Sequence, residues 1–306
     1  DRLGIQGVLT SNPDELLFFN GFGEMPVSSE GTKIFISGSF SKSQPGSTLK
    51  QFKVEGNSNT FTVRASHPFI RSRGKNLKGY LGFTSRNSKT NLLNENITDD
   101  RLRILKLGMA YDFVDRLRGV NLFSFGLSKG MNIMDASGPG SLKLSRADGR
   151  SDFTKLSGDI LRLQELGSGW SLLTGVGWQY AFDSLLSSEE FGLGGPQYVR
   201  AYDPSEVTGD HGIAFKLELQ KGVKTNWNYL KSLQPYLYFD HGTVALRNTT
   251  AVQDSSSSLT AVGLGMRGNI NKWLSGYIEV GQPLSGDVSA EGNSDPRFFF
   301  SLNAHY

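Results

Sequence analysis

The segment Gly212-Ile213-Ala214-Phe215-Lys216-Leu217-Glu218-Leu219-Gln220 decides the fold, because apolar residues alternate in it with polar or very small ones. Successive side chains of a β-strand point to opposite faces, so such a segment has one apolar and one polar face. The apolar face comprises Ile213, Phe215, Leu217 and Leu219. The pattern predicts a strand that separates an apolar from a polar environment.

The same period of two recurs along the chain, for example over 105–113, 170–182 and 262–269. Trp170 and Trp178 share a face and lie about 26 Å apart at roughly 3.3 Å per residue, a spacing that suits aromatic girdles at two membrane interfaces. About 14 such segments occur, many of roughly 9 to 14 residues. Soluble strands are shorter, about 5 to 6 residues, whereas a tilted membrane strand has about this length.

The connections between these segments alternate in length, with the stretch 220–233 as the main exception. The short connections are 71–75, 115–119, 165–168 and 269–272, and the long ones are 86–100, 130–150, 183–211, 244–259 and 283–296. Short periplasmic turns and long external loops produce this rhythm in outer-membrane barrels. A soluble β-sandwich or lipocalin-like barrel explains the alternating side chains but not this rhythm. We therefore expect an all-β, antiparallel transmembrane β-barrel.

The composition agrees with this expectation and excludes several other classes. The chain has 37 glycines, 20 phenylalanines, 10 tyrosines and no cysteine, so disulfide scaffolds, thiolate catalysis and cysteine metal sites are excluded. Its formal net charge is only +3, and the charges are interspersed, so nothing indicates nucleic-acid binding. No stretch approaches the roughly 18 to 20 apolar residues of a membrane helix. The chain opens on Asp1-Arg2 without a signal-peptide pattern, and we expect a processed or truncated start.

The last residues form an amphipathic strand that ends on an aromatic residue. Phe298, Phe300, Leu302, Ala304 and Tyr306 share one parity. This resembles the C-terminal strand by which the barrel-assembly machinery recognises outer-membrane barrels for insertion. If Tyr306 faces the periplasm, the long connections are extracellular.

The longest connection, 183–211, contains no helix pattern, and a connection of this kind is usually functional or disordered. Its glycines, among them Gly194, Gly195 and Gly209, permit a sharply folded loop. Within it, Val199-Arg200-Ala201-Tyr202 resembles the Val-Arg-Gly-Tyr motif in the sixth extracellular loop of the Omp85 superfamily. Alanine stands where glycine is usual, so a positive φ at Ala201 would be strained.

The resemblance is to the transporters of two-partner secretion systems, the haemolysin secretion and activation family (TpsB; ShlB/FhaC/HecB), and it extends over nearly the whole chain. The flanking stretches Glu190–Gly195 and Gly209–Gly212 are similar to that group, as are 144–146 with 152–156 and 68–73 with 76–77. In this family the loop dips into the barrel, and its arginine pairs with an aspartate of an Asp-any-Gly signature on the inner wall. Asp240 and Gly242 match that signature.

Parity independently places Asp240 on the polar face of its strand, because Pro235, Leu237 and Phe239 form the apolar face. An Arg–carboxylate pair with part of its hydration removed would be a strong and directional latch. The alternative is that Arg200 and Asp240 are two unrelated polar residues in a wet channel.

The resemblance implies a monomeric, 16-stranded pore in the outer membrane of a Gram-negative bacterium. Such a pore exports one secreted partner protein of the adhesin, haemolysin or haem-binding type and uses no cofactor or metal. We expect residues 1–306 to be one barrel domain, surrounded by outer-membrane lipid, with the inward loop at about 183–211. The N-terminal plug helix and periplasmic POTRA domains of complete members are expected to be absent. The alternatives are a barrel-assembly insertase of the same superfamily, a passive porin and an outer-membrane hydrolase.

Three further motifs receive simpler interpretations. Gly263-Leu264-Gly265-Met266-Arg267-Gly268 fits a dinucleotide-binding pattern, but it lies in an alternating segment with no helix after it. The pairs Asp210-His211 and Asp240-His241 invite a hydrolase reading, yet adjacent residues of a strand face opposite ways. The serine run 255–258 is predicted to be a flexible external loop. No catalytic residue is therefore assigned.

Overall fold

The computed structural model describes residues 1–10, 15–44, 51–138, 140–227, 230–248, 255–271 and 273–304. They form two compact units, each composed of separate stretches of the chain. The first unit comprises Asp1–Tyr111, Ser124–Leu156 and Ala181–Glu189, and the second comprises Asp112–Phe123, Ser157–Tyr180 and Glu190–Tyr306. Across these described ranges, no helix is both long and apolar enough to cross a membrane.

The first unit is an antiparallel meander in which β1 to β5 pair in chain order. Its strands are β1 (Arg2–Leu9), β2 (Leu16–Pro26), β3 (Lys33–Ser43), β4 (Glu55–Arg71), β5 (Lys75–Leu92) and most of β6 (Glu95–Val114). The pairing of β4 with β5 shifts register between Pro68 and Ile70. A bulge suits this place, because proline has no N–H to donate to the ladder.

The stretch 86–100, expected as a long connection, is a tight hairpin instead. β5 ends at Leu92 and β6 begins at Glu95, so the turn consists of Leu93 and Asn94. Both turn residues have positive φ angles, 50° and 70°, as a two-residue hairpin of the primed type requires. The prediction was wrong because this stretch is polar on both faces and lacks the usual glycine of such turns.

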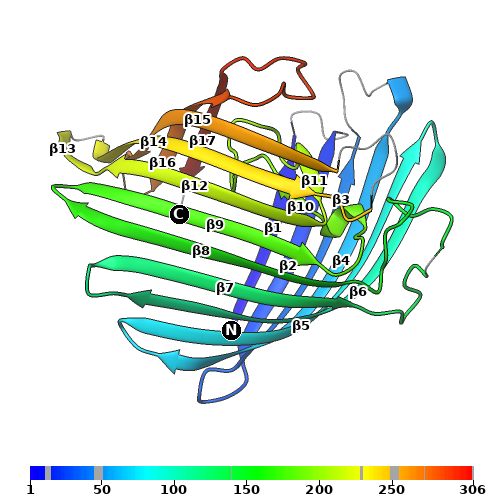
Figure 1. Cartoon of the computed structure of the whole chain (residues 1–306). Coiled ribbons are helices and arrows are strands. Elements are labelled where there is room, and N and C mark those ends of the chain that lie inside the picture. The colour runs from blue at the N-terminus through cyan, green and yellow to red at the C-terminus, as the bar shows by residue number, and fades with distance from the viewer. Residues whose placement is uncertain are drawn as a thin grey trace. The chain divides into compact units, whose positions relative to one another are not determined.

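The second unit contains a wall of six strands, β9 (Trp170–Ala181), β12 (His211–Lys221), β14 (Leu230–Ala245), β15 (Ser256–Asn269), β16 (Leu274–Pro283) and β17 (Arg297–Ala304). These strands pair antiparallel in this order. Figure 1 shows β12, β14 and β15 side by side, coloured from yellow-green to orange. We call this sheet the wall. The remaining long strands, β7 (Gly119–Gly130) and β8 (Thr154–Gly167), contribute residues to both units.

Two connections of the second unit differ from their predicted form. The stretch 220–233 continues as strand, because β13 (Val223–Trp227) pairs with β14 and lengthens that hairpin. The serines predicted as a loop belong to β15 from Ser256 onward, where Ser258 pairs with Thr243 and their hydroxyls lie 2.8 Å apart. Small polar side chains are compatible with an exposed strand end, so composition alone misplaced this boundary.

The number of strands agrees with the sequence. The described residues contain 17 strands, of which β10 (Phe191–Leu193) and β11 (Val207–Gly209) form a separate hairpin and β13 pairs only with β14. The other 14 strands correspond to the 14 or so alternating segments. The prediction of an all-β, antiparallel fold is confirmed.

Burial in the wall is the reverse of that in a soluble protein. On β12, Ile213 is 57% exposed whereas Glu218 is 1% exposed. On β14, Leu237 is exposed while Tyr236, Tyr238 and Asp240 are buried. Large apolar side chains therefore face outward and polar ones pack on the opposite face, as the period of two predicts for strands in a bilayer.

The C-terminal strand β17 follows the same rule. Phe298, Phe300 and Leu302 all lie on one face and are more than half exposed. Tyr306, the last residue of the predicted insertion signal, lies outside the described residues.

Candidate functional site

The long connection between β9 and β12, residues 182–210, is referred to here as the long loop. Within it, β10 and β11 pair as a hairpin. Directly after β10, the chain enters a tight turn at Gly194 and Gly195, whose φ angles are 103° and 85°. Their amides donate to the carbonyls of Tyr198 and Tyr202, which closes the turn around Arg200. These φ angles favour glycine, so this turn depends on the two glycines predicted from the sequence.

The backbone strain in the motif lies at Val199 rather than at Ala201. Val199 has a φ of 61°, which is a rare conformation for a β-branched residue. Ala201 is not among the described residues with positive φ, so it adopts a conformation open to alanine. Its methyl group lies against β16, because a Cβ built on Gly281 would be 3.0 Å from the Cβ of Ala201. The glycine of the wall thus gives room to the alanine of the loop.

The Arg200 side chain lies against Asp240 on β14. Its Nε is 2.8 Å from Oδ2 and its Nη2 is 3.0 Å from Oδ1, so the contact is bidentate. The backbone N–H of Arg200 also donates to Oδ2, at 3.2 Å. The side chains of Arg200 and Asp240 are 9% and 0% exposed. This geometry is that of a strong, charge-assisted pair.

A second carboxylate contacts the same guanidinium. Glu218 of β12 accepts a hydrogen bond from Nη1 of Arg200, and it also accepts two from Arg267 of β15, at 2.5 and 3.1 Å. Glu279 of β16 lies 4.0 Å from Arg200. Burial opposes the charge of Arg200, but its bonds to Asp240 and then Glu218 outweigh this effect and raise the pKa of Arg200 above its ordinary value. The arginine is therefore permanently charged.

Two tyrosines of β14 cover the arginines. The Arg200 guanidinium lies 3.7 Å from the ring centre of Tyr238, and that of Arg267 lies 3.8 Å from the ring centre of Tyr236. The Tyr236 hydroxyl donates to Glu279 at 2.6 Å. Each stacked ring restricts its guanidinium group and covers one face of it. We call Arg200, Glu218, Asp240, Arg267, Glu279 and these tyrosines the tip cluster.

Loop residues next to Arg200 make further contacts within the second unit. The Tyr202 hydroxyl donates to the carbonyl of Ser285 at 2.5 Å. The Tyr198 hydroxyl donates to Asp159 of β8 at 3.1 Å. Burial is the main cause that raises the pKa of Tyr198, and the charge of Asp159 adds to it. Lys216 donates to the carbonyl of Gln197. The loop is thus held by residues on both sides of Arg200.

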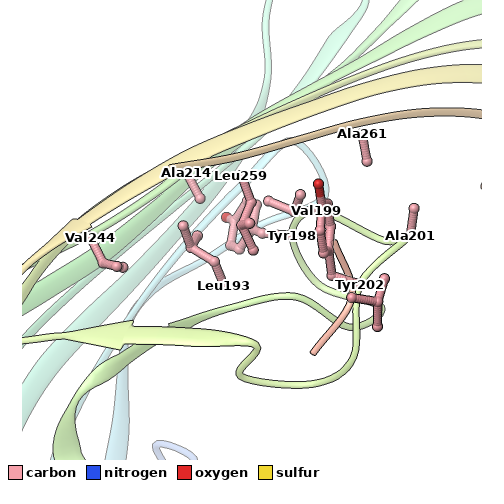
Figure 2. Close-up of a cluster of buried hydrophobic side chains, with 10 residues drawn as sticks. Leu193, Tyr198, Val199, Ala201, Tyr202, Ala214, Val244, Leu259 and Ala261 are labelled. Carbon is pink, nitrogen blue, oxygen red and sulfur yellow. The ribbon is translucent and has the colours of Figure 1, made fainter. Parts of the chain in front are cut away.

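Apolar side chains of the loop pack against the wall, as Figure 2 shows for Leu193 beside Ala214 and Val244, and Val199 and Tyr202 belong to the same buried cluster. A Cβ on Gly242 would lie 2.5 Å from the Leu193 side chain. This explains why the residue two positions after Asp240 is glycine. Gly209 is equally crowded, since a Cβ there would lie 2.8 Å from the carbonyl oxygen of Ala245.

The sequence named Arg200, Asp240 and Gly242, and the structure brings all three together. It did not single out Glu218, Arg267, Glu279 or the two tyrosines. Parity already placed Glu218 on the polar face, but only the register, which sets Glu218 opposite Tyr238, shows that it reaches Arg200. Phe298, Phe300 and Leu302 face outward on β17 and take no part in this cluster.

The motifs set aside from the sequence have structural explanations. Gly263 and Gly265 lie in β15, where a Cβ would meet the rings of Tyr238 and Tyr236. His241 is exposed and lies 2.9 Å from the Thr260 hydroxyl, whereas Asp240 is buried, so the two do not form a dyad. In the part of the chain that the structure describes, no group of three or more His, Cys, Asp or Glu residues could hold a metal.

Comparison with solved structures supports the same fold. The chain is similar to CdiB from Escherichia coli, with a TM-score of 0.75 and 17% identity over 99% of this chain and 59% of that one. It is similar to CdiB from Acinetobacter baumannii, with a TM-score of 0.71 and 20% identity over 96% and 51%. BamA from Haemophilus ducreyi lacking POTRA domains 1–3 matches with a TM-score of 0.67 and 11% identity over 99% and 64%. The chain thus spans between about half and two thirds of these proteins.

The sequence comparisons are more specific. No curated protein matches the chain significantly. The model of the haemolysin secretion/activation protein family ShlB/FhaC/HecB matches residues 21–268, which is most of the chain. The chain belongs to this family of outer-membrane β-barrels of Gram-negative bacteria.

Proposed function

We propose that this chain is the barrel part of a transporter that exports one large partner protein across the outer membrane in a two-partner secretion system. The partner is a secreted protein of the adhesin, haemolysin or haem-binding type, and the transporter acts as a monomer. The Val199-Arg200-Ala201-Tyr202 segment fixes the long loop to the wall, and this position of the loop is required for export. Family membership supports the transport role.

The observation that carries the proposal is the buried, bidentate contact between Arg200 and Asp240. An exposed ion pair contributes about 0 to 1 kcal/mol, whereas removing one partner of a buried pair costs about 3 to 5 kcal/mol. The contact can therefore hold a loop of this length in one place. It also argues against a passive porin, which would need no inward arginine latch.

The test is export of the co-expressed partner protein by the full-length transporter. Wild type is compared with Arg200→Ala at equal amounts of folded barrel in the outer membrane, measured by heat-modifiable mobility. Arg116→Ala is the matched control, because Arg116 is exposed in a short turn. We expect export to fall at least about tenfold for Arg200→Ala, which corresponds to about 1.4 kcal/mol, and to be unchanged for the control.

Other outcomes would favour the alternatives. If Arg200→Ala leaves export intact but impairs assembly of unrelated barrels, the chain is an insertase. If only the uptake of small solutes changes, it is a porin. A hydrolase would lose activity on lipid or peptide after substitution of His211 or His241, and we propose no such activity.

A further inference from the structure

The base of the long loop is held within the first unit by contacts different from those of the tip cluster. Leu185 and Leu186 are fully buried and pack with Phe153 and with two residues of β6, Leu102 and Ile104. The backbone of Leu185 also forms a parallel bridge with Arg150, and the backbone N–H of Arg150 donates to the carbonyl of Ser184 at 2.9 Å. After β9, the first residues of the long loop are therefore packed in a buried apolar cluster.

A buried carboxylate directly follows this surface. Glu189 ends the short 3-10 turn η2 (Ser187–Glu189) and is 4% exposed. Its Oε1 accepts from Nη1 of Arg86 on β5, and its Oε2 accepts from Nζ of Lys155 on β8, both at 2.9 Å. The same two cations bond to the backbone: Arg86 donates to the Ser188 carbonyl at 3.0 Å and Lys155 to that of Glu189 at 2.6 Å.

These contacts give Glu189 a role that a neutral residue could not fill. Burial acts to raise the pKa of Glu189, but the charge of Lys155 and then those of Lys106 and Arg86 outweigh burial and lower it. The carboxylate is therefore ionised in the folded chain. Without its charge, Lys155 and Arg86 would repel each other, and Lys155, which is 10% exposed, would lose a counter-ion.

We propose that Glu189 is a positioning residue that anchors the base of the long loop through Arg86 and Lys155, independently of the Arg200 contacts at the tip. The loop thus has two ion-paired attachments, and export requires both. The consequence for export rests on the proposed function, whereas the attachment itself does not.

Residues 1–306 contain no cysteine, so single cysteines introduced among them can report on each attachment separately, in a full-length transporter from which any cysteine elsewhere has been removed. Ser184→Cys reports on the base and Ala201→Cys on the tip, because Ser184 is 3% and Ala201 is 0% exposed. The rate of labelling by a hydrophilic maleimide is measured on the full-length transporter in outer membranes. Glu189→Gln should raise labelling at the base reporter at least about tenfold and leave the tip reporter unchanged. Arg200→Ala should raise labelling at the tip reporter at least about tenfold and leave the base reporter unchanged.

A second set of variants separates a specific charge contact from general loosening. Lys155→Met removes the cation and keeps much of its volume, so Glu189→Gln should add little to it at the base reporter. Asp148→Asn is the control, since Asp148 is exposed in the connection between β7 and β8. If a variant does not fold, the remaining single substitution still tests the pair.

Equal labelling in wild type and Glu189→Gln, or fully additive effects with Lys155→Met, would overturn the anchor. If the base reporter responds as expected but export is unaffected by either Glu189→Gln or Arg200→Ala, the anchor stands and the proposed function fails. If only Arg200→Ala reduces export, the claim that both attachments are required is wrong.

Discussion

The tip and the base of the long loop use opposite distributions of charge. At the tip, the loop supplies a cation, Arg200, to a wall that carries the three carboxylates Asp240, Glu218 and Glu279. At the base, the loop supplies an anion, Glu189, to two cations on strands. The tip adds stacked tyrosine rings, whereas the base adds aliphatic packing.

This difference shows which residue is least replaceable at each end. A wall with surplus carboxylates needs the loop's cation, and a pair of cations needs the loop's anion. In both places the loop residue supplies the charge that the facing strands lack, so its removal leaves at least one buried or partly buried charge without its partner.

The largest effect is expected for the pair at the tip. Arg200→Ala and Asp240→Ala should each destabilise the docked loop by about 3 to 5 kcal/mol, because the first leaves Asp240 buried without Arg200 and the second leaves Arg200 with Glu218 as its remaining hydrogen-bonded carboxylate. The double variant should be less destabilised than the sum of the two, with a coupling of about 0.5 to 3 kcal/mol. Labelling at Ala201→Cys measures the effect. Purely additive losses would mean that the two residues are not partners.

A smaller effect is expected where the loop packs on glycine. Gly242→Ala places a Cβ 2.5 Å from Leu193, so loop or strand must shift, at about 1 to 3 kcal/mol. Gly38→Ala on β3 is the matched control, since no atom lies within 4 Å of a Cβ there. Urea unfolding in lipid vesicles should separate the two variants. Equal midpoints would show that Leu193 adapts without strain.

Acid should release the base of the long loop. Despite burial, the Lys155 charge lowers the pKa of Glu189 in the folded chain below its ordinary value of 4.5, so the stability that Glu189 provides is present above pH 4.5 and is lost as pH falls through the folded pKa. The rate of labelling at Ser184→Cys, divided by that of a free thiol at the same pH, should therefore rise below pH 4.5 in wild type. A Glu189→Gln background that retained the same acid response would contradict this cause.

The smallest effect is expected at the position where alanine replaces the usual glycine. Ala201→Gly should change the stability of the docked loop by no more than about 1 kcal/mol, because Ala201 needs no positive φ. The reverse substitution across the contact, Gly281→Ala, should be worse, since its Cβ would lie 2.6 Å from the Tyr238 hydroxyl. Export at equal barrel levels compares the two. A stronger defect for Ala201→Gly would mean that the alanine methyl itself is required.

The fold could be predicted because a period of two in side-chain polarity is a local property. Ile213 and Leu237 reveal the outward face without knowledge of any partner strand. Strand ends were less predictable where both faces are polar: the hairpin at Leu93-Asn94 and the start of β15 at Ser256 show no change in pattern. Apolar periodicity marks the part of a strand that faces lipid. It does not mark the polar end by which the strand extends beyond the lipid.

The site could be predicted only in part, because its partners come from different strands. Arg200 and Asp240 were found through a motif and through parity. Glu218 and Arg267 lie 49 positions apart and meet only through the register of β12, β14 and β15. Glu189 is adjacent to a recognisable motif, yet its cations, Arg86 and Lys155, carry no local signal that distinguishes them from other basic residues.

Glu218 is shared between two arginines, and this has a consequence for how the loop could be released. If Arg200 withdraws, Glu218 keeps its two hydrogen bonds to Arg267 and remains neutralised. Asp240 instead loses both of its side-chain bonds from Arg200. The electrostatic penalty of withdrawal therefore falls mainly on one carboxylate. The Arg200 contact is therefore suited to reversible dissociation, because Arg267 and Glu218 stay paired on the wall and Asp240 is left to bind the same arginine again.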